Sequence, residues 1–600
     1  MALFGDASVT AVWRFDEAPE KVWRVVADTA RLNELAGLPR YTLTETPGAD
    51  GAVTRIGAAR IGSWSLEWEE PPAEWVAGHW FRQERHLRRG PVRRFLTRYA
   101  LEPDGGGTRV TFEVTADPIG LNGLFLRSTN FLSRIARAVE KHFRQLVTLP
   151  AIPVSAADAV EVSPEARARA AAAAARLTEQ GYAEGGRLAQ YVLTADEAVL
   201  ERIRPIELAR EWSLDRRRVI ELCLAAVKAE LLTSRWDLLC PRCRGAKLSV
   251  TSLAELPKTA HCPSCNVAYD RSFAKNVELT FRPAPAVRPL GTGAYCLSGP
   301  KSTPHVAVQL SVAPGDRRMV AAVLPPGPCR IRTVEPGGEA EFELGASLPA
   351  IVLEGKEVKV ADTGQPGVVA VENRGDARRT LVIEDRGWTA DALTAHAATT
   401  LHAFRDAFAT DALRPGDDVE IGSVALMFTD LKGSTALYAR LGDAAAYRLV
   451  RRHFAFLEGV VREHEGAIVK TIGDAVMAVF GDPGKAVAAA LDVQRRIGPE
   501  LGGDPAEVVI KIGVHAGHCI AVTANDRLDY FGTTVNLAAR LQDRAAGGEV
   551  VISQELAADP AVAVLLQPLT CLEERALLRG FTTDTTFIRV PAIRAAPTSP

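Results

Sequence analysis

The most restrictive feature of this sequence is the order of its segments between residues 420 and 517. An apolar strand (VALMFTD) precedes a helix-forming segment (GDAAAYRLVRRHFAFLEGVVREH). Two strands in AIVKTIGDAVMAVF then meet at Gly473 and Asp474, and a second helix (GKAVAAALDVQRRI) leads to the strand EVVIKIGVHAG. This β-α-β-β-α-β order predicts a ferredoxin-like domain. Asp430 then ends the first strand, and Asp474 lies at the tip of the hairpin.

In that plan Asp430 and Asp474 face each other across neighbouring strands. Two carboxylates at one edge can hold two Mg²⁺ or Mn²⁺ ions, an arrangement that phosphoryl transfer uses. One ion lowers the pKa of the attacking hydroxyl, and the other neutralises the triphosphate and the leaving pyrophosphate. The intervening LKGST segment should wrap phosphates with backbone N–H groups, so Gly433, Ser434 and Thr435 are candidate substrate contacts.

Three stretches, FTDLKGST, KTIGD and DYFGTTVNLAAR, resemble the signature segments of class III adenylate cyclases. The resemblance covers residues 420–595 and implies a palm-type nucleotidyl cyclase catalytic domain over residues 417–595. It also implies the reaction, in which the ribose 3′-hydroxyl of ATP attacks the α-phosphate in line to give cyclic AMP and pyrophosphate. Residues 1–416 would then be sensory and coupling regions.

The resemblance also assigns individual residues. Lys470 and Asp529 match the pair that reads adenine, because adenine offers an acceptor at N1 and a donor at N6 while guanine presents the reverse. Asn536 and Arg540 stand four apart at the start of a helix, so both lie on one face. The resemblance has Asn536 orient the ribose and Arg540 stabilise charge on the α-phosphate, and it has the carbonyl of Leu431 bind a metal.

In the resembling enzymes the two aspartates come from one protomer and the other four residues from its partner, which implies a homodimer with two sites. Any one of these residues alone could be an ordinary cap or surface charge, whereas the matches at the correct offsets favour an enzyme. Two alternatives stay open: a nucleotide-binding regulator that acts through the zinc-ribbon and helical modules, and a guanylate cyclase, which Lys470 and Asp529 oppose. The sequence departs from the family at His518, where a carboxylate or a small residue is common.

Two CPxC pairs separated by eighteen residues predict a second metal site. Each pair can offer two thiolates on one turn, and two pairs complete a tetrahedral zinc site with no open position. The site should hold one structural Zn²⁺ in a ribbon over residues 239–275. A redox CxxC pair is the competing reading, which the doubling of the motif opposes. The predicted ligands are Cys240, Cys243, Cys262 and Cys265.

Residues 1–150 open with an alternating strand and a helix, continue with more strands, and close with a long amphipathic helix. This order resembles the START-like helix-grip domains, which implies a cavity for an apolar small molecule. An α+β packing domain without a ligand explains the pattern equally well.

The remaining segments predict coupling elements. Residues 151–180 form a helical linker, 181–238 a winged-helix-like module and 276–388 a β-sandwich-like domain. The helical module, ribbon and sandwich together resemble an uncharacterised region upstream of some bacterial cyclases. Residues 389–416 carry an apolar seam that predicts either a dimer helix or a helix packed on its own sandwich.

At 600 residues the chain is too long for one core, so a multidomain α+β protein is expected. A formal net charge of −2 gives no general attraction to nucleic acid or anionic membrane, and no nucleic-acid partner is predicted. The sequence lacks an apolar run long enough for a membrane span, and its start lacks the pattern of a signal peptide. A cytoplasmic protein is therefore expected.

Overall fold

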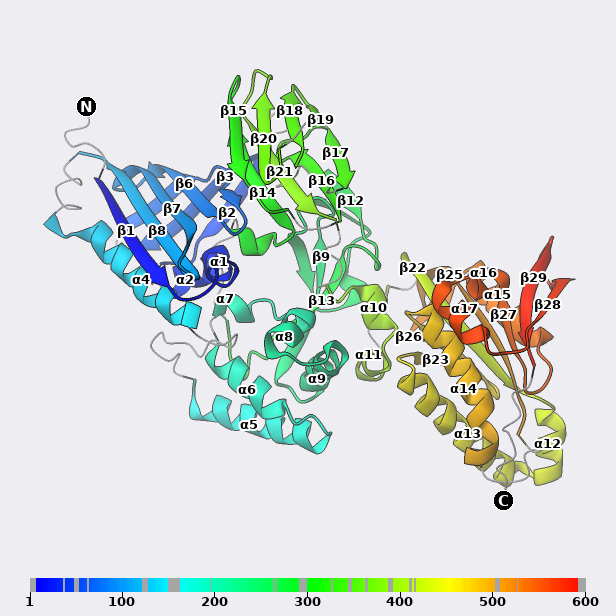
Figure 1. Ribbon diagram of the computed structural model, residues 1–600. Helices are drawn as coiled ribbons and strands as arrows, with labels where there is room; N and C mark the ends of the chain where they lie inside the picture. The colour runs from blue at the N-terminus through cyan, green and yellow to red at the C-terminus, as the bar shows by residue number, and fades with distance from the viewer. Residues whose placement is uncertain are drawn as a thin grey trace.

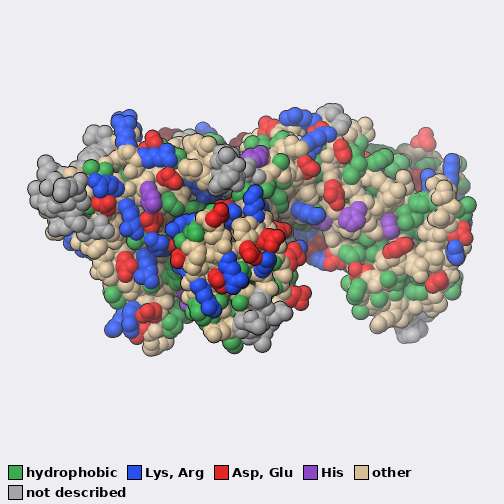
Figure 2. All heavy atoms as spheres, turned by 90° about the horizontal axis from the view of Figure 1, so that it is seen from above, with side chains coloured by type: hydrophobic (Ala, Val, Ile, Leu, Met, Phe, Trp, Pro, Cys, Tyr) green, Lys and Arg blue, Asp and Glu red, His purple; other side chains and the backbone are tan. Residues whose placement is uncertain are grey.

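The computed structural model describes residues 7–591 except 36–37, 48–52, 62–63, 121–127, 149–161, 196, 263–264, 266, 291–298, 325–326, 344–347, 362–364, 387–391, 409–412, 415–416, 502–507 and 526. The chain forms an elongated molecule in which the N-terminal sheet and the C-terminal domain lie at opposite ends (Figure 1). Charged side chains of both signs are interspersed over the face shown in Figure 2. No helix in the described part of the chain is long and apolar enough to cross a membrane.

The N-terminal region is a curved antiparallel sheet covered by a long helix. Its elements are β1 (Ala7–Phe15), α1 (Pro19–Ala27), α2 (Thr29–Leu35), β2 (Thr42–Pro47), β3 (Val53–Ile61), β4 (Trp64–Glu69), β5 (Glu74–Val76), β6 (Trp80–Arg89), β7 (Val92–Asp104), β8 (Gly107–Pro118) and α4 (Phe131–Thr148). The alternation of buried and half-buried residues along β8 reflects a sheet with one face on the core.

Aromatic rings fill the contact between this sheet and α4. Trp13 stacks on Phe112 with ring centroids 5.4 Å apart, and Phe143 of α4 lies 5.5 Å from Trp13. Tyr99 lies 4.8 Å from Phe112. The sheet and α4 are therefore in direct contact, and a ligand bound between them would have to displace these rings.

The β-sandwich is continuous with the N-terminal sheet, which the sequence did not predict. Its strands are β14 (Val306–Val312), β15 (Arg317–Ala321), β16 (Pro328–Thr333), β17 (Glu339–Glu343), β18 (Ala350–Glu354), β19 (Glu357–Ala361), β20 (Val368–Asn373) and β21 (Arg379–Asp385). β14 pairs with β5 through Val308 and Val76, so the order β1-β8-β7-β6-β5-β14-β21-β16-β17 runs through both regions. A second sheet, β15-β20-β18-β19, closes the sandwich.

A helical module, a three-stranded sheet and a two-stranded hairpin lie between these two regions in the sequence. The elements are α5 (Pro164–Glu179), α6 (Gly185–Thr194), α7 (Glu197–Leu200), α8 (Pro205–Trp212), α9 (Arg216–Lys228), β9 (Leu232–Leu239), β10 (Ala246–Val250), β11 (Thr259–Cys262), β12 (Val267–Asp270) and β13 (Val277–Pro283). α8 and α9 form a helix-turn-helix, with Asp215 capping α9. Arg217 of α9 pairs with Glu221, and Arg218 pairs with Glu184, so these two arginines are engaged within the chain.

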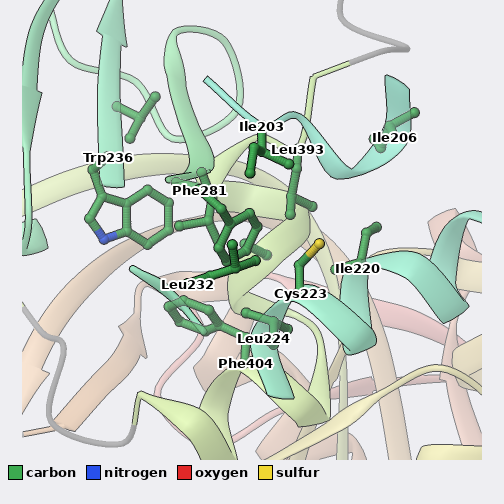
Figure 3. Packing of buried hydrophobic residues seen from close by; sticks show 14 of the residues in the cluster. Ile203, Ile206, Ile220, Cys223, Leu224, Leu232, Trp236, Phe281, Leu393 and Phe404 are labelled. Atoms are coloured by element: carbon green, nitrogen blue, oxygen red, sulfur yellow. The ribbon is translucent and has the colours of Figure 1, made fainter. Parts of the chain in front are cut away.

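Two short helices, α10 (Ala395–Thr399) and α11 (His402–Ala407), stand where the sequence predicts one helix over 389–416, of which residues 389–391, 409–412 and 415–416 lie outside the described part. The chain leaves helical geometry at Leu401, which has a φ of −84° and a ψ of 133°. The apolar seam packs against its own chain: Leu393 and Phe404 are buried in a core shared with Trp236 and Phe281 (Figure 3). The seam thus packs on the helical module and its sheet and not on the β-sandwich, while its role as a dimer helix stays a prediction.

The C-terminal region has the predicted β-α-β-β-α-β order, followed by further elements. They are β22 (Asp418–Leu431), α12 (Ser434–Leu441), α13 (Asp443–Glu463), β23 (Ala467–Ile472), β24 (Ala475–Phe480), α14 (Pro483–Leu501), β25 (Ile510–Ala524), β26 (Arg527–Phe531), α15 (Thr533–Arg544), β27 (Val550–Ser553), α16 (Gln554–Ala557), α17 (Pro560–Leu566), β28 (Leu572–Leu577) and β29 (Asp584–Val590). The sheet order is β23-β24-β22-β25-β27-β29-β28, so β22 is central.

Side chains of β22 alternate between two cores. Met427 and Leu431 pack with α13 and α14, while Leu426 and Phe428 belong to the core that includes α10, α11 and the helical module. The C-terminal domain therefore shares a continuous apolar core with the upstream region.

Candidate active site

The central strand and its neighbouring hairpin bring two carboxylates to one end of the sheet. β22 pairs with β24 through Thr429 and Val476, which places Asp430 beside the turn that carries Asp474. Gly473, with a φ of +65°, supplies the left-handed conformation of that two-residue turn.

Both aspartates act on the same neighbours. Burial raises the pKa of Tyr438 on α12, and the charges of Asp474 and Asp430 add to that increase. Burial lowers the pKa of His453 on α13 to about 4, although the same two charges oppose the change. Both rings are thus uncharged at pH 7. Tyr438 and His453 therefore do not neutralise the negative charge of the two carboxylates.

The carboxylates fit a divalent cation. The Oδ2 atom of Asp474 is buried and has no hydrogen-bond partner among the described residues. A buried carboxylate oxygen without a partner is costly, and a metal ion would relieve that cost. Asp430 is held differently, because Nζ of Lys511 lies 2.7 Å from its Oδ2 atom. A cation bound by both aspartates would compete with Lys511.

The loop after β22 has the form expected of a phosphate-binding turn. Gly433 has a φ of +71° and stands directly before α12, which begins at Ser434. The helix therefore starts inside the LKGST segment, one residue before Thr435. Its first N–H groups point out of the helix start, where an anion would be favoured. Leu431 is buried at the end of β22, where it pairs with Ile510 of β25.

Lys470 and Asp529 meet although they are 59 residues apart in sequence. Nζ of Lys470, on edge strand β23, lies 2.5 Å from Oδ2 of Asp529 on β26. Asp529 is 8% exposed, and its Oδ1 atom accepts a hydrogen bond from the backbone N–H of Tyr530 at 2.8 Å. Both oxygens of this buried carboxylate are thus satisfied by groups in fixed positions.

Asn536 and Arg540 share one face of α15. Asn536 is exposed, and Nη1 of Arg540 lies 2.8 Å from Asp543 on the next turn. α15 can lie close to β25 because Gly513 has no side chain: a Cβ atom there would lie 2.2 Å from the backbone nitrogen of Gln542. Among the described residues, no hydrogen bond or ion pair within one chain joins Arg540 to Asp430 or Asp474. The predicted residues therefore form separate groups in one protomer.

Sequence reasoning missed Lys511 and α12. Lys511 stands directly opposite Asp430 in the β25 register, so the strand pairing could have indicated it. His518, the departure from the family pattern, is exposed on β25, with Nδ1 4.0 Å from Oε1 of Glu420.

The four CPxC cysteines converge on one point. Cys240 and Cys243 follow β9, and Cys262 and Cys265 lie at the turn between β11 and β12. Their sulfur atoms all lie within 4.8 Å of one another, and Cys243 Sγ is 3.7 Å from Cys262 Sγ. Zn–S distances of ~2.3 Å in a tetrahedron give S···S edges of ~3.8 Å. Three of the four residues are buried, so the donor set fits an enclosed zinc ion.

Three family models match separate parts of the chain. Residues 418–561 match the family "Adenylate and Guanylate cyclase catalytic domain". Residues 6–149 match "Polyketide cyclase / dehydrase and lipid transport", a START-like family, and residues 172–294 match a "Family of unknown function (DUF5939)". The protein thus carries a nucleotidyl cyclase catalytic domain. More particularly, it joins that C-terminal domain to an N-terminal START-like domain.

The similar proteins cover only part of the chain. The uncharacterized protein Rv1319c of Mycobacterium tuberculosis is 38% identical over 146 residues, which are 23% of this chain and 27% of that protein. The adenylate cyclase of Mycosarcoma maydis is 34% identical over 158 residues, 23% of this chain and 6% of that protein. The chain therefore spans about a quarter of the mycobacterial relative's length. The solved adenylyl cyclase CyaB of P. aeruginosa shows 24% identity and a TM-score of 0.26, over 30% of this chain and 97% of that one.

Proposed function

We propose that this protein is an adenylate cyclase that converts ATP to cyclic AMP and pyrophosphate in a homodimer. The observation that carries the proposal is the Lys470–Asp529 pair, held in the same domain as two carboxylates at adjoining strand ends. The family match supports a cyclase, and the choice of ATP over GTP rests on this pair.

The pair is complementary to adenine. The ammonium of Lys470 can donate to adenine N1, and the carboxylate of Asp529 can accept from the N6 amino group. Guanine presents an N1–H donor and an O6 acceptor, so it would place donor against donor and acceptor against acceptor. Leaving buried polar groups unpaired costs far more than a poor apolar fit, which makes this an effective filter. Because Lys470 and Asp529 bind each other at 2.5 Å, the purine must separate them when it enters.

The carboxylates supply the reacting end of the site. Divalent cations held there would activate the ribose 3′-hydroxyl and neutralise phosphate charge. Asp430 and Asp474 would hold these ions, with the carbonyl of Leu431 as a further ligand. Gly433, Ser434 and Thr435 would place backbone donors at the phosphates.

Asn536 and Arg540 complete the site from the partner protomer, which also supplies Lys470 and Asp529. Arg540 can exchange its Asp543 contact for an α-phosphate oxygen, because that contact is on the surface and surface ion pairs are weak. Asn536, exposed one turn earlier, would orient the ribose. The separation of these residues from the two aspartates within one chain supports a site shared by two protomers.

We also propose that Cys240, Cys243, Cys262 and Cys265 hold one structural Zn²⁺, and that the regions before residue 417 regulate the cyclase. Helices α10 and α11 share one apolar core with the helical module and with strand β22 of the cyclase domain. This core supports a mechanical connection between the upstream regions and the cyclase domain.

The test is turnover of the purified full-length chain with ATP and with GTP, each with Mg²⁺ or Mn²⁺. The expected product is cyclic AMP, absent in the Asp474→Ala variant. Preferential formation of cyclic GMP would overturn the choice of nucleotide, and failure to cyclise either nucleotide by a confirmed dimer would overturn the proposal.

A further inference from the structure

Helix α11 lies between the helical module and the strands that carry Lys470 and Asp529. It is anchored upstream by two contacts. The Phe404 ring meets Trp236 edge-on, with centroids 5.7 Å apart, and Asp406 lies 2.7 Å from Nζ of Lys228 on α9. Phe404 is fully buried within this group of side chains (Figure 3). The position of α11 therefore follows that of the helical module.

Arg405 reaches from α11 onto β26. Its Nη1 atom donates a hydrogen bond to the carbonyl of Leu528 at 3.0 Å, and its guanidinium carbon lies 5.0 Å from the centre of the Tyr530 ring. Its Nε atom donates to the carbonyl of Thr399 at 2.9 Å, which ties the end of α10 to the same group. Arg405 thus contacts the residues on either side of Asp529, which are Leu528 and Tyr530.

One of these two residues, Tyr530, contacts the Asp529 carboxylate. The N–H of Tyr530 donates to Oδ1 of Asp529 at 2.8 Å, so a shift of Tyr530 changes the direction of the carboxylate. The Tyr530 hydroxyl donates to the Thr399 carbonyl at 3.4 Å, the same oxygen that accepts from Arg405. Oδ2 of Asp529 contacts Lys470. A single network thus runs from α11 to the proposed adenine-reading pair.

We propose that Arg405 is a positioning residue for Asp529 and that it thereby contributes to the choice between adenine and guanine. The proposal rests on the proposed function, because it assumes that Asp529 reads the purine. Arg405 acts on Asp529 through its neighbours Leu528 and Tyr530. It holds the backbone of β26 so that the carboxylate faces Lys470, and it connects this orientation to the helical module through α11.

The experiment compares full-length wild type with Arg405→Ala, Arg405→Lys and a control, measuring kcat and KM for ATP and for GTP. Arg405→Ala should lower the ratio of kcat/KM for ATP to that for GTP by about tenfold, mainly through a higher KM for ATP. Arg405→Lys should recover part of the ratio, since an ammonium keeps the charge over Tyr530 but lacks the fork that reaches two carbonyls.

The control is Arg271→Ala. Arg271 also links the upstream region to the C-terminal domain, through Asp417 at 2.9 Å, but on a segment that does not contain Asp529. Its loss should leave the ATP to GTP ratio unchanged. Thermal unfolding of each variant shows how much the substitution destabilises the contact between the upstream region and the C-terminal domain. If Arg405→Ala is poorly folded, the kinetics of Arg405→Lys decide the question.

The outcomes separate the two proposals. If wild type makes cyclic AMP and the Arg405 variants keep its nucleotide ratio, or lose both activities equally, Arg405 has only a structural role and this inference is wrong. If wild type makes no cyclic AMP, the proposed function itself has failed, whatever the variants do.

Discussion

The protein contains two sets of metal-ligand side chains that are built in opposite ways. The four thiols gather within 4.8 Å of one another from two hairpins of the same chain, and three are buried. The two carboxylates stand at adjoining strand ends, where Asp430 is bound to Lys511 and one oxygen of Asp474 has no partner among the described residues. The thiol set is complete in itself, whereas the carboxylate set leaves coordination positions for other ligands.

The difference shows how geometry separates a structural ion from a reactive one. Four thiolates fill a tetrahedral zinc site and stabilise the hairpins that supply them. Two carboxylates leave room for water and phosphate oxygens, which catalysis needs. We therefore expect changes in the thiols to act on stability, and changes around the carboxylates to act on turnover.

The largest effect is expected from Asp474→Asn. The substitution keeps the shape of the side chain but removes the charge, and cyclic AMP formation should fall on the order of 10²–10³-fold. The melting temperature and zinc content should stay those of wild type. A fall in zinc content would show that the two sets are not independent.

Cys262→Ser should act on stability. Loss of one thiolate opens the zinc site, so bound zinc should disappear and the free energy of unfolding should fall by about 4 kcal/mol. The matched control is Cys571→Ser, which changes a half-buried cysteine outside the cluster. It should change neither the zinc content nor the free energy of unfolding. Retention of one zinc per chain by Cys262→Ser would contradict the four-thiolate assignment. Zinc analysis and calorimetry provide the measurements.

A substitution in the Lys470–Asp529 pair tests the purine-binding half of the cyclase site. Lys470→Glu should reverse the polarity at adenine N1 and place a carboxylate near Asp529, so the preference for ATP over GTP should fall about 10²-fold. The metal requirement should not change. If the Mg²⁺ dependence shifts while the nucleotide preference stays, Lys470 belongs with the carboxylates and the proposed division of the site is wrong.

Lys511→Met should have the smallest effect. Because Lys511 occupies the Asp430 carboxylate, its removal should lower the Mg²⁺ concentration needed for half-maximal activity by a few-fold, the scale of one partly exposed ion pair. Lys485→Met removes another lysine that is paired with a glutamate of the same domain, and it should leave the Mg²⁺ dependence unchanged. Titration with Mg²⁺ at saturating ATP measures both.

Features that depend on neighbouring residues in the sequence could be predicted. The strand and helix periods over residues 420–517 specified the order of elements, and the CPxC spacing specified which thiols would meet. The sequence could not show that β5 and β14 join two regions into one sheet, because β5 is three residues long and its partner lies more than 200 residues away. The apolar seam at 393–408 was visible, but its partner depends on tertiary packing, and the break at Leu401 has no strong sequence signal.

The most direct test of the shared active site is complementation between two inactive variants. Asp474→Asn disables the carboxylate half, and Arg540→Ala disables the α15 half. Coexpressed in equal amounts, they should form mixed dimers with one intact site, which would restore cyclic AMP formation to about a quarter of the wild-type level. Each variant alone should be inactive. Absence of any recovery in a preparation proven to contain mixed dimers would contradict a site built from two protomers.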